Sequence, residues 1–233
     1  MRAWVLVAPR LRMARLLAGE AVAELAEAAR GVLLPYPRDL ERYIKRYVSG
    51  AIRWVELLRA VEGSGLPYAG SWEWVEEPLL RRLRSLWERG FRLAVRCYGP
   101  SVGEEAERVA ELLRQILRVR LRGEVDLEEW KRVLSGGRPV PLEEGFVTLS
   151  SKPVKGAAVV EAWRYPPPPT EALSANSVSP EAVKRYVNYI FDFIIPSGSL
   201  DEAYLRWLES QPGWRGAARR LRILAKKLGI LKA

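Results

Sequence analysis

Residues 3–34 read AWVLVAPRLRMARLLAGEAVAELAEAARGVLL, and this stretch decides the fold class. It begins with a continuous apolar run over residues 3–8, whose β-branched and aromatic side chains are typical of a buried strand. Residues 13–30 are rich in the strong helix formers Ala, Leu and Glu, and Gly31 follows them directly. Val32–Leu34 then begins a second short strand, which is predicted to stop at Pro35-Tyr36-Pro37. A strand, a helix and a strand in this order predict a unit of parallel sheet.

The same alternation continues along the chain. Further strands are predicted at residues 91–98, 146–149 and 157–163, and helices at 39–61, 74–89, 101–121 and 126–134. We therefore predict an α/β fold with a mostly parallel sheet of about five strands and helices on both faces. Three helices follow without a strand between them, at 180–195, at 199–210 and in the basic C-terminal segment. The predicted organisation is an α/β domain over 1–174 and a helical region over 175–233 that ends in a basic amphipathic helix.

The composition argues against several kinds of active site. Histidine is absent, which removes the commonest general base and metal ligand. Cys97 is the only cysteine, so a thiolate metal site is excluded, and a lone cysteine is most often a small buried hydrophobe. The first strand exits through Ala8-Pro9-Arg10, without the glycines that let a phosphate approach the backbone. We therefore expect no metal and no cofactor, and lean against an enzyme.

The composition also indicates where the protein is located and what kind of source it comes from. No apolar run reaches the ~18 residues of a membrane span, so we expect no transmembrane segment and a cytoplasmic location. Arg outnumbers Lys by 30 to 8, and Asn, Gln and Met occur twice each. A composition with few thermolabile amide side chains and many charged ones is typical of a thermophilic source. A GC-rich genome also raises the Arg content.

The positive charge is concentrated at the C-terminus. The formal net charge is +10, and residues 212–233 contribute seven basic side chains and no acidic one. These seven are Arg215, Arg219, Arg220, Arg222, Lys226, Lys227 and Lys232. A helix over this segment would place an apolar line, Leu221, Leu224, Leu228 and Leu231, on a different face from its cations. Such a helix can bury its leucines against the rest of the protein and expose a ridge of cations.

Such a cationic ridge suits phosphate backbones, acidic proteins or anionic membrane surfaces. Another interpretation is that the cations complement the dipole of their own helix and neighbouring Glu side chains. Our leading hypothesis is a non-catalytic binding protein that engages DNA or RNA, or a nucleoprotein complex, through these seven side chains. An alternative is a subunit that docks on an acidic protein partner.

A second candidate site follows from the ends of the predicted strands. Open parallel sheets bind ligands outside the carboxyl ends of their strands. The residues at these ends are Tyr36, Arg38, Arg96, Tyr98, Glu161 and Arg164. Together they would line a pocket for an anionic ligand. The other interpretation is that Arg96 and Glu161 form an ion pair on a sheet edge.

Aromatic and basic side chains also alternate in the helix predicted over 180–195. Tyr186, Tyr189 and Phe193 share one face, with Lys184 and Arg185 beside them. Aromatics interleaved with cations stack on unpaired bases in nucleic-acid-binding proteins. The same spacing is also typical of a helix that packs its apolar face into a core.

Residues 1–175 carry a series of short motifs. These are Val32–Leu34, Pro37, Asp39-Leu40, Tyr43, Gly50, Leu57-Leu58, Pro78-Leu79-Leu80, Arg108 and Ala158–Val160 before Pro167. The series resembles the TraB/ChaN-like, or erythromycin-esterase-like, superfamily. Members of that family with proposed activity carry a Glu after the second strand and His residues near strand ends. Here Pro35-Tyr36 stands at the first place and His is absent, so the resemblance implies a degenerate enzyme or an anionic-ligand-binding domain.

Overall fold

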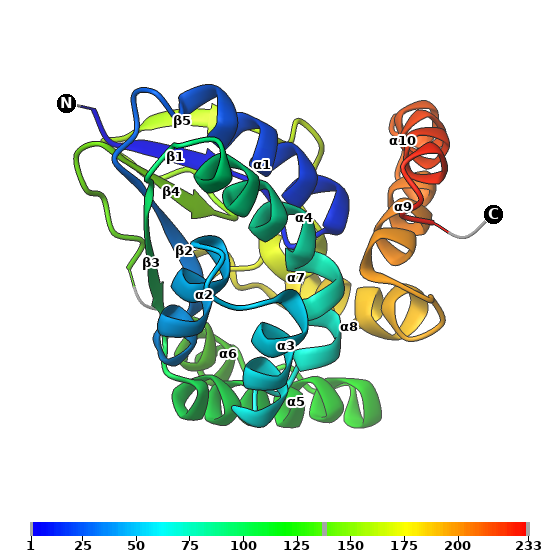
Figure 1. Cartoon of the computed structure of the whole chain (residues 1–233). Coiled ribbons are helices and arrows are strands. Elements are labelled where there is room, and N and C mark those ends of the chain that lie inside the picture. The colour runs from blue at the N-terminus through cyan, green and yellow to red at the C-terminus, as the bar shows by residue number, and fades with distance from the viewer. Residues whose placement is uncertain (1, 137–138, 232–233) are drawn as a thin grey trace. The chain divides into compact units, whose positions relative to one another are not determined.

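The computed structural model describes residues 2–136 and 139–231 (Figure 1). Its chain forms two compact units. Unit 1 comprises Met1–Arg10, Ala14–Glu111 and Gly136–Tyr165. Unit 2 comprises Leu11–Met13, Leu112–Ser135 and Pro166–Ala233. The boundary predicted after residue 174 therefore lies inside unit 2. The predicted helical region is also larger than expected, because it includes residues 112–135.

Unit 1 contains a five-stranded parallel sheet. Its strands are β1 (Trp4–Val7), β2 (Gly31–Pro37), β3 (Ala94–Gly99), β4 (Phe146–Ser150) and β5 (Ala158–Glu161). They lie in the order β3-β2-β4-β1-β5, and each neighbouring pair is parallel. The predicted α/β class and parallel sheet are confirmed.

The centre of the sheet is covered on both faces. Val5 and Leu6 are fully buried in β1, and neighbouring residues of a strand point to opposite faces. Every residue of β4 is buried as well. β1 and β2 are accordingly nearly continuous apolar runs without a polar alternation, as is typical of parallel strands that are buried on both faces.

The helices of unit 1 connect its strands. They are α1 (Arg12–Leu25), α2 (Glu41–Val48), α3 (Trp54–Gly63), α4 (Ala69–Glu88) and the first half of α5 (Val102–Arg122), with a 3₁₀ turn η1 (Arg38–Leu40). A β-carbon on Gly19 would stand 3.0 Å from the Cβ of Arg82, so α1 and α4 approach closely.

Two local predictions in unit 1 are corrected. The single helix predicted at 39–61 is divided into η1, α2 and α3, with Gly50 at a φ of 81° in the break between α2 and α3. β2 does not stop at Pro35 but continues to Pro37, because the pairing with β3 shifts register between Leu34 and Pro37 and accommodates the prolines.

Unit 2 is helical. It contains the second half of α5, then α6 (Leu127–Ser135), α7 (Pro169–Ala172), a 3₁₀ turn η2 (Ala175–Ser177), α8 (Pro180–Tyr189), a π-helix η3 (Ile190–Ile194), α9 (Leu200–Ser210) and α10 (Arg215–Lys227). Trp130 of α6 packs edge-on against Tyr186 of α8, with ring centroids 5.5 Å apart. This cluster also contains Ile116 and Val119 of α5, which explains why that half of α5 belongs to unit 2.

None of the helices in the described part of the chain combines the length and the apolar character needed to cross a membrane.

Candidate nucleic-acid interface

The basic C-terminal segment forms a helix, α10, drawn in red in Figure 1. Ala217, Ala218, Leu221 and Ala225 are its buried residues, and all but one are alanine. Small side chains allow two helices to approach closely. The neighbouring helix α9 contributes Glu209, whose carboxylate accepts from Nε and Nη2 of Arg222 at 3.2 Å and 2.9 Å. This paired contact fixes how α10 is rotated against α9.

The rotation differs from the one predicted from the leucines. Leu221 is buried, but Leu224 and Leu228 are nearly half exposed. Ile223 is 58% exposed. The prediction of a buried leucine line was wrong because the helix packs through its alanine face instead. As a result, apolar side chains stand among the cations on the exposed side.

The structure divides the seven predicted cations into groups. Arg222 is neutralised by Glu209, and Nε of Arg215 donates to the Glu209 carbonyl oxygen at 3.3 Å. Lys232 lies outside the described residues. Four remain: Arg219, Arg220, Lys226 and Lys227. These four are exposed, and their side chains have no ion-pair or hydrogen-bond partner within residues 2–136 and 139–231. We call them the α10 quartet.

The α10 quartet forms two rows. At about 100° per residue, positions seven apart lie within about 20° of each other on a helix. Arg219 and Lys226 therefore share one row, and Arg220 and Lys227 share a second row about 100° away. Ile223 lies between the two rows. The exposed face of α10 is thus cationic on both sides of a single apolar residue.

Many other arginines of the chain are neutralised locally. Arg38 pairs with Glu104 at 3.0 Å, Arg82 with Glu20 at 2.6 Å and Arg108 with Glu105 at 2.7 Å. Such surface pairs contribute about 0–1 kcal/mol each to stability, but they also cancel the local charge. The α10 quartet lacks this compensation.

The predicted strand-end pocket is not assembled. β3 and β5 are the two edge strands, with β2, β4 and β1 between them. Arg96 of β3 and Glu161 of β5 therefore lie at opposite edges, about 19 Å apart at the usual strand spacing. The predicted Arg96–Glu161 pair was wrong, and Arg96 pairs with Glu143 at 2.7 Å instead. The strand pattern of the sequence carries no information on strand order, which caused the error.

The other members of that predicted pocket have separate surroundings. Tyr36 is buried, and the Tyr98 hydroxyl donates to the Leu149 carbonyl oxygen at 2.6 Å. Arg38 pairs with Glu104, as described above. Arg164 is exposed, beyond the end of β5. Tyr36, Arg38 and Tyr98 are thus buried or bonded to other groups, whereas Arg164 is exposed.

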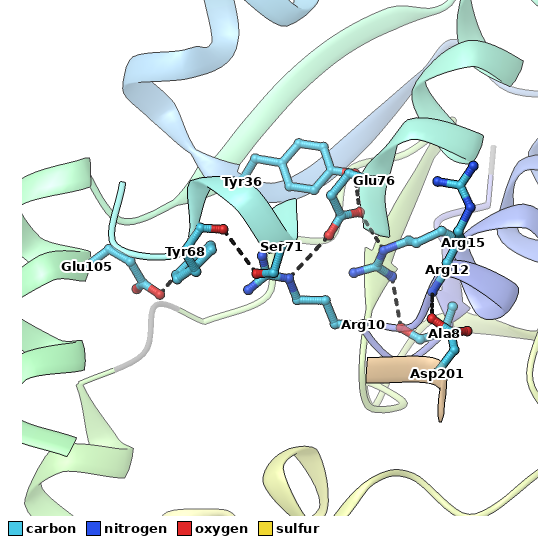
Figure 2. A network of polar contacts seen from close by, with 10 residues as sticks. All are labelled: Ala8, Arg10, Arg12, Arg15, Tyr36, Tyr68, Ser71, Glu76, Glu105 and Asp201. Atoms are coloured by element: carbon cyan, nitrogen blue, oxygen red, sulfur yellow. Dashed lines mark hydrogen bonds and ion pairs between the residues drawn. The ribbon is translucent and has the colours of Figure 1, made fainter. Parts of the chain in front are cut away.

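A different group gathers near the carboxyl ends of β1 and β2 (Figure 2). Its centre is Glu76 of α4, whose side chain is 1% exposed. Oε2 accepts from Nε of Arg15 at 2.6 Å and from the Tyr36 hydroxyl at 2.8 Å. Oε1 lies 3.4 Å from Nε of Arg10. Arg15 also donates to the Ala8 carbonyl oxygen at 3.1 Å, which ties the network to the end of β1.

The network continues through Tyr68. The Arg10 guanidinium lies over the Tyr68 ring, 4.0 Å from its centroid, and the Tyr68 hydroxyl donates to Glu105 at 3.0 Å (Figure 2). Burial raises the pKa of the Tyr68 hydroxyl above its ordinary value. Burial and the nearby Glu76 carboxylate raise the pKa of Tyr36 well above its ordinary value. Both phenols therefore stay protonated as donors, and the network has the properties of a structural core.

Sequence reasoning missed Glu76, although a signal was present. In α4, Trp72, Leu79 and Leu83 are buried at helical spacing, and Glu76 falls on the same line. A carboxylate within an apolar stripe needs a buried partner. Arg15, which sits among Ala and Leu in α1, was the corresponding signal on the other side.

The remaining candidates for chemistry have ordinary structural roles. Burial raises the pKa of the Cys97 thiol, and the Glu41 carboxylate raises it further, so the reactive thiolate is disfavoured. Across the described residues, no three Asp, Glu or Cys side chains form a cluster that could hold a metal ion.

Comparisons with protein-family models, with curated proteins and with solved structures found no match to this chain.

Proposed function

We propose that this protein binds nucleic acid through the phosphate backbone and that α10 is the contacting element. The observation that carries the proposal is the α10 quartet: four exposed cations within residues 219–227, without a carboxylate partner among the described residues. Four cations held close together repel one another, and the energy of this repulsion is offset when an anionic partner lies against them.

The spacing of the quartet suits a polyphosphate. Arg219 and Lys226 are seven residues apart, which corresponds to about 10 Å along the helix axis. One strand of B-DNA carries about three phosphates over that length. Contact with several phosphates releases condensed counterions, and this release supplies a large part of the affinity.

The sheet edge offers weaker support for a second function. An anionic-ligand site there, as the TraB/ChaN-like resemblance implies, would need Arg38 and Arg96 to face one ligand. Both arginines are paired with carboxylates, at 3.0 Å and 2.7 Å. The geometry of α10 therefore favours nucleic acid.

The test is a variant in which the α10 quartet is changed to Gln. Gln is a good helix former, and the four positions are exposed, so folding should be retained. We expect the affinity for DNA or RNA, measured by fluorescence anisotropy at ~100 mM salt, to fall at least about tenfold, because phosphate contacts dominate binding.

The matched control removes the same charge elsewhere. Arg30, Arg46, Arg59 and Lys155 are exposed cations of unit 1, and their change to Gln gives the same net charge. The control should keep most of the affinity. Equal losses in both variants would show that net charge alone matters, and the assignment to α10 would be abandoned.

The same variants also test two other anionic partners, a membrane surface and an acidic protein. Binding to anionic vesicles without binding to nucleic acid would replace the proposal with a membrane surface, for which exposed Ile223 and Leu224 are suited. Co-purification with an acidic protein that survives nuclease treatment and requires the α10 quartet would replace it with a protein partner.

A further inference from the structure

Unit 2 contains an open pocket that plays no part in the argument so far. Its volume is about 470 Å³, within the range of small-ligand sites. α8, η3, α9 and the residue after α9 supply its lining: Glu181, Lys184, Arg185, Asn188, Tyr189, Asp192, Phe193, Trp207 and Gln211. The site therefore includes two of the three residues in the aromatic stripe seen in the sequence.

Three aromatic rings of the pocket support one another. Tyr189 and Trp207 are 2% and 8% exposed, and their rings meet edge to face with centroids 5.8 Å apart. Phe193 stacks on Tyr189 at 6.0 Å and is half-buried. Phe193 belongs to the π-helix η3, and π-helical segments occur frequently at functional sites. The result is a partly exposed ring on a rigid aromatic support.

Two carboxamides stand beside this ring. The chain has only two Asn and two Gln, and one of each, Asn188 and Gln211, lines the pocket. Asn188 is exposed, and its side-chain amide has no hydrogen-bond partner among the described residues. Nε2 of Gln211 donates to the Trp207 carbonyl oxygen and to Ser210, so its Oε1 remains an acceptor. Carboxamides match the donor and acceptor pattern of base edges.

The charged side chains that line the pocket balance one another, and the pocket lies close to α10 along the chain. Lys184 and Arg185 are exposed and form no ion pair within the described residues, while Glu181 and Asp192 balance their charge. Gln211 is four residues before Arg215, the first residue of α10, so at most about 14 Å of chain separates the pocket from that helix.

We propose that this pocket holds one unpaired base of a single-stranded nucleic acid, stacked on Phe193, while α10 contacts phosphates of the same strand. This inference rests on the proposed function and names its substrate class. A neutral set of lining charges fits a base, which is uncharged, better than it fits a free anion. Duplex nucleic acid keeps its bases stacked and paired, so it would contact α10 without filling the pocket.

The test compares two variants, Phe193→Ala and Asn188→Ala, on a 12-nucleotide single strand and on a duplex of the same sequence, as DNA and as RNA. Stacking is worth ~1–3 kcal/mol per base, so Phe193→Ala should weaken single-strand binding by about fivefold to 100-fold. Duplex affinity and the salt dependence should stay unchanged. Asn188 is exposed and without partner in the described chain, so its variant removes base contact without disturbing the fold.

Phe91→Ala is the matched control, because Phe91 is also half-buried but lies in unit 1. It should bind both nucleic acids like the original chain. A bromouracil-substituted strand should crosslink within residues 184–211 on irradiation.

The outcomes separate this inference from the proposed function. If Phe193→Ala and Asn188→Ala leave single-strand binding unchanged while the quartet variant loses it, the pocket proposal is overturned and the α10 proposal stands. If the original chain binds neither form of nucleic acid, both proposals fall.

Discussion

At the scale of single residues, Glu76 is the clearest determinant of stability in unit 1. Its carboxylate provides the counter-charge for Arg15, whose side chain is 4% exposed, and accepts from the Tyr36 hydroxyl. Removing one partner of a buried ion pair leaves the other charge desolvated, at a cost of about 3–5 kcal/mol. We expect Glu76→Gln to lower the free energy of unfolding, measured with denaturant, by that amount.

The control is Glu20→Gln, which breaks the surface pair with Arg82. A change of about 0–1 kcal/mol is expected there. Similar losses from the two substitutions would contradict the structural role assigned to the buried network.

Asp201 leads to a second prediction, which concerns how the stability of the protein depends on pH. One carboxylate oxygen accepts the backbone N–H group of Arg12 at 2.9 Å (Figure 2). The other accepts the backbone N–H group of Met13, also at 2.9 Å. Burial nevertheless raises the pKa of Asp201, although these hydrogen bonds lower it in part. The folded chain therefore holds this proton more tightly than the unfolded chain, where the pKa is near ~3.9.

The sign of the effect follows from linkage. The contribution of Asp201 to stability is complete below about pH 4 and decreases as the pH rises through the raised folded pKa. Asp201→Asn does not titrate. The unfolding free energy of the original chain minus that of Asp201→Asn should therefore fall from about pH 3.5 to pH 7. A difference that is constant, or that rises with pH, would refute this account.

At the scale of elements, a single glycine separates α2 from α3. Gly50 has a φ of 81°, a conformation that other residues adopt at a cost of about 1–2 kcal/mol. Gly50→Ala should lower the melting temperature for this reason. Gly63, at the end of α3, has an ordinary φ and open space around its α-carbon, so Gly63→Ala should raise stability by about 0.5–1 kcal/mol.

These opposite signs are measured by thermal unfolding of the two variants. Destabilisation by both would mean that steric crowding, and not backbone conformation, decides the effect of a side chain at these sites.

The sequence located most elements because their signals are local. Apolar runs marked the strands, and Ser179 and Ser199 marked the starts of α8 and α9, where their hydroxyls accept from Ala182 and Glu202. Non-local features were missed. The rotation of α10 depends on Glu209 of α9 and on an alanine face, and neither is visible in the helical pattern of α10 alone.

At the scale of the whole molecule, the fold class followed from the order of strands and helices, but the arrangement of the sheet did not. The crossover that places β4 and β1 between β2 and β5 separates Arg96 from Glu161 and removes the predicted strand-end pocket. The division into two units was also beyond local reasoning, since it depends on the packing of Ile116 and Trp130 in one cluster with Tyr186.

The charge distribution is the molecular property on which the proposed function rests. Residues 1–211 carry 31 basic and 28 acidic side chains, whereas residues 212–233 carry seven basic and none acidic. The α10 quartet is the part of this excess that remains uncompensated among the described residues.

The most direct test of this account is the salt dependence of nucleic-acid binding, measured for the original chain and for the quartet-to-Gln variant. Four phosphate contacts give a slope of log affinity against log salt of about −3 to −4. We expect this slope for the original chain and a slope near zero for the variant. A slope that is the same in both proteins, or no binding by the original chain at ~100 mM salt, would contradict the assignment of α10 as the nucleic-acid interface.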